Sequence, residues 1–150
     1  MQAINITIRK ATAADIPAVY SLIKEFAAFQ KTPEKVVITP EQMKGDKDLF
    51  QCNVAETADK KIIGFASYFF AYYSWSGKAV YLDDLYVQPA YRKQGIGKKL
   101  LRHVFSLAKE THCKKVRWQV SKWNNAAIEF YKSMGASIDE VEINCDYPLQ

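Results

Sequence analysis

One segment near the middle of the chain constrains the fold more than any other. Residues 81–87 are rich in the aromatic and β-branched side chains typical of a strand, and Pro89 cannot continue a β-ladder. Gly95 and Gly97 then open a helix, with apolar residues at helical spacing through residues 96–108. Glycine lets a backbone approach a ligand closely, and the free N–H groups of a helix start attract phosphate oxygens. The segment therefore predicts a phosphate-binding turn between a strand and a helix.

The rest of the chain predicts a meander of strands before this turn and helix–strand units after it. Strands are expected at residues 1–10, 52–56, 62–72, 79–87, 116–120 and 137–143. Helices are expected after the capping-box pattern of Thr12 and Asp15, briefly after Thr39, and at residues 96–108 and 124–134. This order predicts an α/β (α+β) fold, with a mixed, mostly antiparallel central sheet flanked by helices. The length of 150 residues, without a linker-like tract, predicts one domain over residues 1–150.

Composition predicts a folded cytoplasmic protein. Hydrophobic residues make up 49% of the chain and charged residues 25%, which argues against disorder, and no apolar stretch is long enough to span a bilayer. The alternating start reads as a strand and not as a signal peptide. Cys52, Cys113 and Cys145 form no Cys-x-x-Cys pair, so neither a disulfide framework nor a metal site is expected. His103 and His112 are explained by surface positions on helices.

The net charge of +5 is concentrated around the glycine turn. One basic group comprises Arg92, Lys93, Lys98, Lys99 and Arg102, and a second comprises Lys114, Lys115 and Arg117. A nucleic-acid-binding protein would spread its basic residues over one face with stacking aromatics. Focused charge favours a small anionic ligand, so neither a nucleic-acid nor a membrane partner is expected.

The spacing of the turn separates the families that bind phosphate. A Walker A loop requires glycine in place of Arg92 and Ser or Thr in place of Lys99, and a Rossmann fingerprint requires a third glycine in place of Leu100. What matches is Arg-x-x-Gly-x-Gly, which resembles the pyrophosphate-binding motif of the GNAT superfamily of N-acetyltransferases. The surrounding sequence fits as well, at residues 81–87, Trp123-Asn124, Phe130-Tyr131-Lys132 and Gly135-Ala136.

Within that superfamily the chain is most similar to the spermidine/spermine and thialysine acetyltransferase branch. Ile8-Arg9, residues 11–15, residues 22–25, Trp75 and Gly77-Lys78 also fit this branch, so the similarity spans nearly the whole chain. The resemblance implies acetyl-CoA as co-substrate and a homodimer. It implies these residues at the acetyl-CoA site: Leu85, Tyr86, Val87, Arg92, Lys93, Gln94, Gly95, Ile96, Gly97, Lys98, Asn124, Ala127 and Tyr131. In particular, the Val87 N–H would contact the thioester carbonyl, and residues 85–87 would pair with the pantetheine arm.

The resemblance also implies the catalytic residues. Tyr131 falls at the general acid that protonates the departing thiolate, although packing as a core aromatic is the alternative. Asp83 occupies the place of a glutamate that the resemblance implies to act as base through water, and Asp84 follows it. Adjacent strand residues face opposite sides, so one of the two should reach the site while the other caps or pairs. Asn124 either hydrogen-bonds the pantetheine or caps its own helix, or both.

The implied acceptor site departs from the branch. Its candidate residues are Phe29, Gln30, Trp75, Asp83 and Asp84, but Gln30 and Tyr73 stand where the branch has carboxylates. Fewer carboxylates weaken the attraction of a polycation, so polyamine specificity is not predicted. The predicted function is transfer of acetyl from acetyl-CoA to a small primary amine in a ternary complex. The alternative is a sensor that binds acyl-CoA without turnover, and Tyr131 argues against it.

Overall fold

The computed structural model of the protein describes residues 4–149. These residues divide into an N-terminal unit that ends at Trp118 and a C-terminal unit that begins at Gln119. The prediction of one domain over residues 1–150 stays a prediction. Residues 1–3 of the first expected strand lie outside the described part.

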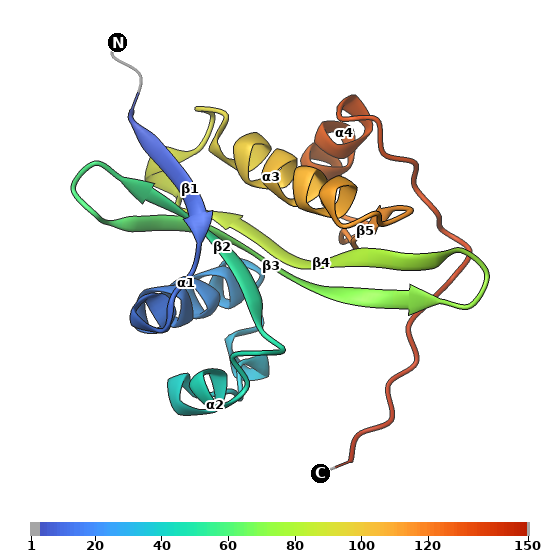
Figure 1. The fold of residues 1–150 in the computed structure, drawn as a ribbon, viewed down its shortest axis with the longest axis horizontal. Helices are drawn as coiled ribbons and strands as arrows, with labels where there is room; N and C mark the ends of the chain where they lie inside the picture. The colour runs from blue at the N-terminus through green and yellow to red at the C-terminus, as the bar shows by residue number, and fades with distance from the viewer. Residues whose placement is uncertain (1–3, 150) are drawn as a thin grey trace. The chain divides into compact units, whose positions relative to one another are not determined.

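The N-terminal unit is built on a five-stranded sheet with the order β1-β2-β3-β4-β5 (Figure 1). The strands are β1 (Ile6–Lys10), β2 (Gln51–Thr57), β3 (Ile62–Tyr73), β4 (Gly77–Val87) and β5 (Val116–Arg117). The first four pair antiparallel in sequence order, whereas β5 is parallel to β4. The predicted mixed, mostly antiparallel sheet is confirmed, but the strand expected at residues 116–120 is only two residues long.

Two long helices cover the two faces of this sheet (Figure 1). On one face, α1 (Ile16–Phe29) buries Ile16, Val19 and Leu22 in a cluster with Phe65 and Tyr86 of the sheet. On the other face, α3 (Ile96–Glu110) buries the apolar stripe Ile96, Leu100, Leu101 and Val104. Each such side chain contributes about 1.5–3 kcal/mol when fully buried. Both faces are covered, which explains why the five central residues of β2 are all buried.

Short helical turns complete the N-terminal unit: η1 (Ala13–Asp15), η2 (Pro33–Lys35), α2 (Pro40–Gly45) and η3 (Pro89–Tyr91). The predicted capping box of Thr12 and Asp15 is present and leads through η1 into α1. The predicted start at Thr39 is also present, because the Thr39 hydroxyl accepts a hydrogen bond from the Gln42 N–H. Both helices therefore begin where the sequence indicates.

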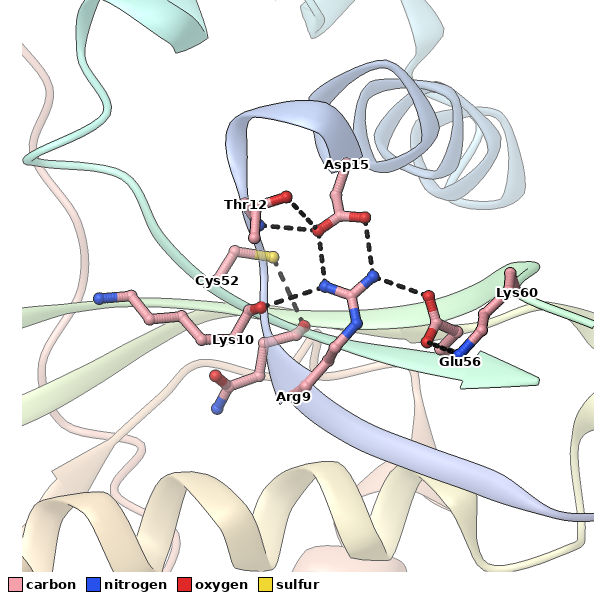
Figure 2. A network of polar contacts seen from close by, with 8 residues as sticks. Arg9, Lys10, Thr12, Asp15, Cys52, Glu56 and Lys60 are labelled. Atoms are coloured by element: carbon pink, nitrogen blue, oxygen red, sulfur yellow. Dashed lines mark hydrogen bonds and ion pairs between the residues drawn. The ribbon is translucent and has the colours of Figure 1, made fainter. Parts of the chain in front are cut away.

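Arg9 joins three elements at one edge of the sheet (Figure 2). Its guanidinium donates two hydrogen bonds to the Asp15 carboxylate, at 2.7 and 2.9 Å, and one to Glu56 at 2.7 Å. The hydrogen bonds from Arg9 lower the pKa of Asp15 to about 2 and also lower the pKa of Glu56. Arg9 and residues 11–15, which carry part of the family resemblance, thus tie β1 to β2 and to the start of α1. Their role in this structure is scaffolding.

The described part of the C-terminal unit contains one helix, α4 (Asn125–Ser133). The helix ends before Gly135, which is in the left-handed conformation with φ of 96°. Among the described residues after this glycine there is no helix or strand. The strand predicted at residues 137–143 is therefore wrong. Val141 and Ile143 are 83% and 84% exposed, and an apolar alternation without a ladder partner does not make a stable strand.

Candidate active site

The second half of β4 contains a β-bulge at Asp83. Leu82 pairs with Tyr68 of β3, and Asp84 pairs with the preceding residue, Ser67, so Asp83 has no partner of its own. The Asp84 N–H donates to the Ser67 hydroxyl at 3.2 Å. Bulges of this kind re-aim the residues that follow them and often lie beside active sites.

The bulge determines which backbone groups point away from β3. The Gln88 N–H donates to the Ile63 carbonyl of β3 at 2.9 Å, and alternate residues of a strand direct their N–H groups to opposite edges. The N–H groups of Leu85 and Val87 therefore point to the other edge of β4. Within the N-terminal unit, β5 pairs there only with Val80 and Tyr81. The edge at residues 85–87 can thus pair with an extended ligand.

The two aspartates at the bulge are in different environments. The side chain of Asp83 is exposed, whereas that of Asp84 is partly buried. Loss of hydration raises the pKa of both, and together with the nearby charge of Asp83 it raises the pKa of Asp84 to about 6. Because the bulge interrupts the strand alternation, alternation alone does not decide which carboxylate faces a ligand.

The glycine turn leads directly into the start of α3, as expected from its spacing. Lys93 and Gly95 are both left-handed, with φ of 62° and 78°, and Gly95 is the N-cap of α3. The Lys99 N–H donates to the Gly95 carbonyl, so the three preceding N–H groups of α3 have no acceptor within the helix. The first turn carries no acidic residue, and Lys98 and Lys99 are exposed. The start of α3 thus presents N–H groups that have no acceptor within the helix, beside exposed basic side chains.

The side chain of Arg92 points into the protein framework. Its Nε–H donates to the Val87 carbonyl at 2.8 Å. Its Cζ lies 4.8 Å from the ring centroid of Phe29 and 5.4 Å from that of Tyr86, within the range of cation–π contact. Arg92 therefore brings the turn, the end of β4 and the end of α1 together. Phe29, predicted at the acceptor site, lies in this group, and Gln30 follows it as the C-cap of α1.

Glu25 completes the group, and its role was missed in the sequence. The Tyr86 hydroxyl donates to one Glu25 oxygen at 2.8 Å, and the Gln88 amide donates to the other at 3.1 Å. Burial first, and then the Glu25 carboxylate, raise the pKa of Tyr86 to about 12. Glu25 and Phe29 also line an open depression of about 720 Å³ with Lys61 and Tyr91. The four-residue spacing places Glu25 and Phe29 on one face of α1, but no local pattern signals the bond between Glu25 and Tyr86.

Trp75 lies at the other end of the β3–β4 hairpin and is fully exposed. Strand β4 has 11 residues from Gly77 to Val87, so its two ends lie roughly 33 Å apart at a rise of about 3.3 Å per residue. Within the N-terminal unit, Trp75 is therefore not brought close to Val87. Tyr73, which replaces a carboxylate of the branch, has Lys115 Nζ and Arg117 Cζ each 4.6 Å from its ring centroid.

The remaining predicted residues, Asn124, Ala127 and Tyr131, belong to the C-terminal unit. Asn124 is the N-cap of α4, and its Oδ1 accepts a hydrogen bond from the Ala127 N–H at 3.2 Å. The capping alternative for Asn124 is thus realised, which leaves its amide N–H groups for other partners. Burial raises the pKa of Tyr131, so its phenol is protonated near neutral pH and can donate a proton.

Comparison with known proteins identifies the family. The sequence profile of the acetyltransferase (GNAT) family matches residues 16–136, which extend over both units. The chain belongs to this family. It is 36% identical over 140 residues to the thialysine N-epsilon-acetyltransferase of Mus musculus, covering 86% of this chain and 82% of that protein. It is 40% identical over 139 residues to the spermidine/spermine N(1)-acetyltransferase-like protein 1 of Homo sapiens, covering 86% of this chain and 20% of that protein.

Solved structures agree on the fold. An aminoglycoside acetyltransferase from an uncultured soil metagenomic sample, in complex with sisomicin, aligns with a TM-score of 0.80 and 24% identity over 97% of each chain. An aminoglycoside N-acetyltransferase in complex with CoA aligns with a TM-score of 0.78 and 18% identity, also over 97% of each chain. At these identities the similarity concerns the fold.

The family confirms the predicted enzyme class, an N-acetyltransferase, and members of this family use acetyl-CoA. Across residues 4–149, no helix is both long and apolar enough to cross a membrane. In the same part of the chain, no group of three or more His, Cys, Asp or Glu side chains is arranged to hold a metal ion.

Proposed function

We propose that the protein transfers the acetyl group of acetyl-CoA to the primary amine of a small molecule, by direct attack in a ternary complex. The observation that carries this proposal is the open edge of β4 at residues 85–87, directly followed by the anion-binding start of α3. A strand edge suits the amide groups of a pantetheine arm, and free helix N–H groups suit a pyrophosphate. An extended ligand that contains both a pantetheine arm and a pyrophosphate, such as acetyl-CoA, fits a strand edge followed directly by a helix start.

Each step of the transfer has a candidate group in the chain. The Val87 N–H, which points to the open edge, stabilises the negative charge that develops on the thioester oxygen as the amine attacks. A carboxylate at the bulge, Asp83 by resemblance, accepts the proton of the amine through water. When the carbon–sulfur bond breaks, the Tyr131 phenol supplies the proton for the CoA thiolate, and its raised pKa keeps that proton in place before the reaction.

The proposed acetyl-CoA contacts in the N-terminal unit fall into two groups. The N–H groups of residues 96–98, with Lys93 and Lys98, hold the pyrophosphate, and the backbone of residues 85–87 holds the pantetheine. In the C-terminal unit, Asn124 and Ala127 at the start of α4 are the expected further contacts, together with Tyr131.

The acceptor is an amine of the polyamine, thialysine or a related type, in line with the names of the relatives. Phe29, Gln30, Trp75 and the bulge aspartates are its proposed binding residues. Gln30 is uncharged, and Tyr73 already faces two cations, so these positions offer no attraction to a second or third ammonium group. This supports an acceptor with fewer positive charges than spermine.

We further propose a cytoplasmic homodimer. The β3–β4 hairpin exposes Phe69, Phe70 and Tyr72, and an exposed group of aromatic side chains is typical of an interaction surface. The unpaired cysteines suit a reducing compartment.

The decisive experiment follows free thiol release when the purified protein is mixed with acetyl-CoA and thialysine, spermidine, spermine or aminoalkyl compounds. We expect release with at least one amine. Tight binding of CoA without release for any amine would instead support the sensor.

Exchanging Tyr131 for Phe tests the acid. We expect Tyr131→Phe to lower kcat by about 10²–10⁴-fold, the usual contribution of general acid–base catalysis, and to lower the affinity for CoA much less. Tyr147→Phe is the matched control, since Tyr147 lies in the same unit and is 88% exposed. Unchanged turnover of Tyr131→Phe would remove Tyr131 from the acid role.

A further inference from the structure

Arg92 is the residue of the glycine turn whose side chain is most engaged with the protein itself. Its Nε–H bond to the Val87 carbonyl joins the turn to the end of β4, five positions earlier in the chain. Its guanidinium also lies against Phe29 of α1 and Tyr86 of β4. These three contacts fix the guanidinium between a helix and a strand, whereas the free N–H groups of the turn lie at the start of α3.

The residues on both sides of Val87 are held from α1. The Tyr86 ring stacks on Phe26 with centroids 5.1 Å apart, and its hydroxyl is fixed by Glu25. Gln88 is fixed by the second Glu25 oxygen and by its backbone bond to Ile63. Val87 itself has its carbonyl held by Arg92. Tyr86, Val87 and Gln88, at and directly after the end of β4, are thus each held by side-chain contacts.

The function of this arrangement follows from what Val87 does in the proposed reaction. The N–H and C=O groups of one strand residue point to the same edge, so holding the Val87 carbonyl also holds its N–H in the direction of the open edge. Oxyanion stabilisation depends on donors that are aimed before the charge develops. A displaced Val87 N–H would lower turnover even when acetyl-CoA binds normally.

We propose that Arg92 is a positioning residue for the Val87 N–H and not a ligand of the CoA pyrophosphate. Glu25 of α1 supports this arrangement by holding the residues on both sides of Val87. This rests on the proposed acetyl transfer. The side-chain chemistry explains why arginine stands here. A guanidinium donates from Nε while its flat face lies on an aromatic ring, but the point charge of lysine cannot do both.

The test compares two acetyl donors with wild type and Arg92→Lys. One donor is acetyl-CoA, and the other is S-acetylpantetheine, which has the same thioester and pantetheine arm but no pyrophosphate. Turnover of the wild type is measured first with each donor and an accepted amine. Absence of transfer in this control would refute the proposed function and is thus recognised separately from a failure of the positioning role.

For Arg92→Lys we expect kcat/KM to fall about tenfold to a hundredfold with both donors, which is the range for losing a hydrogen bond to a charged group. Most of the loss should appear in kcat. Lys98→Met is the contrasting variant. Because its side chain is proposed to contact phosphate, kcat/KM should fall with acetyl-CoA and change little with S-acetylpantetheine. The positioning role is refuted if Arg92→Lys is as active as wild type with both donors. It is also refuted if the loss of activity seen with acetyl-CoA disappears with S-acetylpantetheine.

Glu25→Gln keeps the test valid if Arg92→Lys fails to fold. It retains an oxygen that can accept the Tyr86 hydrogen bond but removes the charge. We expect a severalfold fall in kcat with both donors and an unchanged CoA dissociation constant. Glu110→Gln is the matched control, since Glu110 is an exposed carboxylate at the end of α3. Equal activity of the two glutamine variants would overturn the supporting role of Glu25.

Discussion

The two ends of β4 differ in how firmly neighbouring elements hold them. At the Val87 end, α1 contributes Glu25 and Phe29, the turn contributes Arg92, and Val87 itself is buried. At the Gly77 end, the hairpin tip carries Trp75, which is fully exposed, and Tyr72, which is 81% exposed. We call the Val87 end of β4 the fixed end and the Gly77 end the free end.

This difference separates two kinds of predicted site residue. The proposed oxyanion donor, the Val87 N–H, must be aimed precisely, and it lies at the fixed end, where packing and hydrogen bonds remove alternatives. Aromatic side chains at the free end have the exposure needed to contact another molecule, but no neighbour that orients them. Substitutions at the fixed end should therefore affect both folding and turnover. Substitutions at the free end should disturb neither by way of contacts within the N-terminal unit.

The largest effect is expected from Gly64→Ala, at the position opposite Val87. A Cβ on Gly64 would lie 2.9 Å from the Tyr86 carbonyl oxygen and 3.3 Å from Val87 Cγ2, so the end of β4 would have to move. We expect a loss of about 1–3 kcal/mol in the free energy of unfolding, as for other overpacked cores, and a lower kcat in the folded enzyme. Urea denaturation and steady-state kinetics measure the two effects.

Gly45→Ala is the matched control. Nothing lies within 4 Å of a Cβ at Gly45, at the end of α2. Its free energy of unfolding should stay within about 0.5 kcal/mol of wild type or rise slightly. If the two alanine variants behave alike, the end of β4 is not tightly held and the contrast between its two ends fails.

A smaller effect, which depends on pH, is expected from Asp84→Asn. The pKa of Asp84 is raised to about 6 in the folded protein, above its ordinary value, so the folded state binds a proton more tightly than the unfolded chain. The resulting stabilisation is complete at low pH and is lost as the pH rises through about 6. Asparagine carries no charge, so Asp84→Asn should gain stability relative to wild type on going from pH 4.5 to pH 7.5. The gain should be about 1–2 kcal/mol after allowance for partial solvation.

Asp83→Asn is the comparison for this experiment and should gain less, because Asp83 is exposed. The same pair of variants identifies the base. With wild type, kcat/KM should fall as the pH decreases and the catalytic carboxylate becomes protonated, and the variant that lacks that carboxylate should lose this dependence. A stability difference between Asp84→Asn and wild type that does not change with pH would show that Asp84 is well hydrated.

The glycine turn was predictable from the sequence because its determinants are local. A left-handed Gly95, a helix start and nearby lysines follow from a few adjacent residues. The wrong strand at residues 137–143 shows the limit of the same reasoning. Its apolar alternation is local too, but a strand also requires a partner with free backbone groups, which a pattern within one segment does not reveal.

The features that shape the candidate site were not predictable because they join distant residues. The bulge at Asp83 arises from the register between β3 and β4, and nothing in the order of residues 81–85 marks it. The bond between Tyr86 and Glu25 joins residues 61 positions apart. Arg92 appeared as part of a phosphate-binding motif, but only the three-dimensional structure reveals its contacts with Val87 and Phe29.

The smallest effect on stability is expected from Trp75→Ala at the free end. Because Trp75 is fully exposed, its removal should change the free energy of unfolding by less than about 0.5 kcal/mol. This makes it a clean probe of the acceptor site, since a change in kinetics cannot then be attributed to unfolding. Within the N-terminal unit the tip is far from Val87, so a substrate role for Trp75 cannot come from contacts within this unit alone. If Trp75 has such a role, KM for the amine should rise while KM for acetyl-CoA stays the same. If KM for the amine is also unchanged, Trp75 does not bind the acceptor, and the free end of β4 serves another purpose than the reaction.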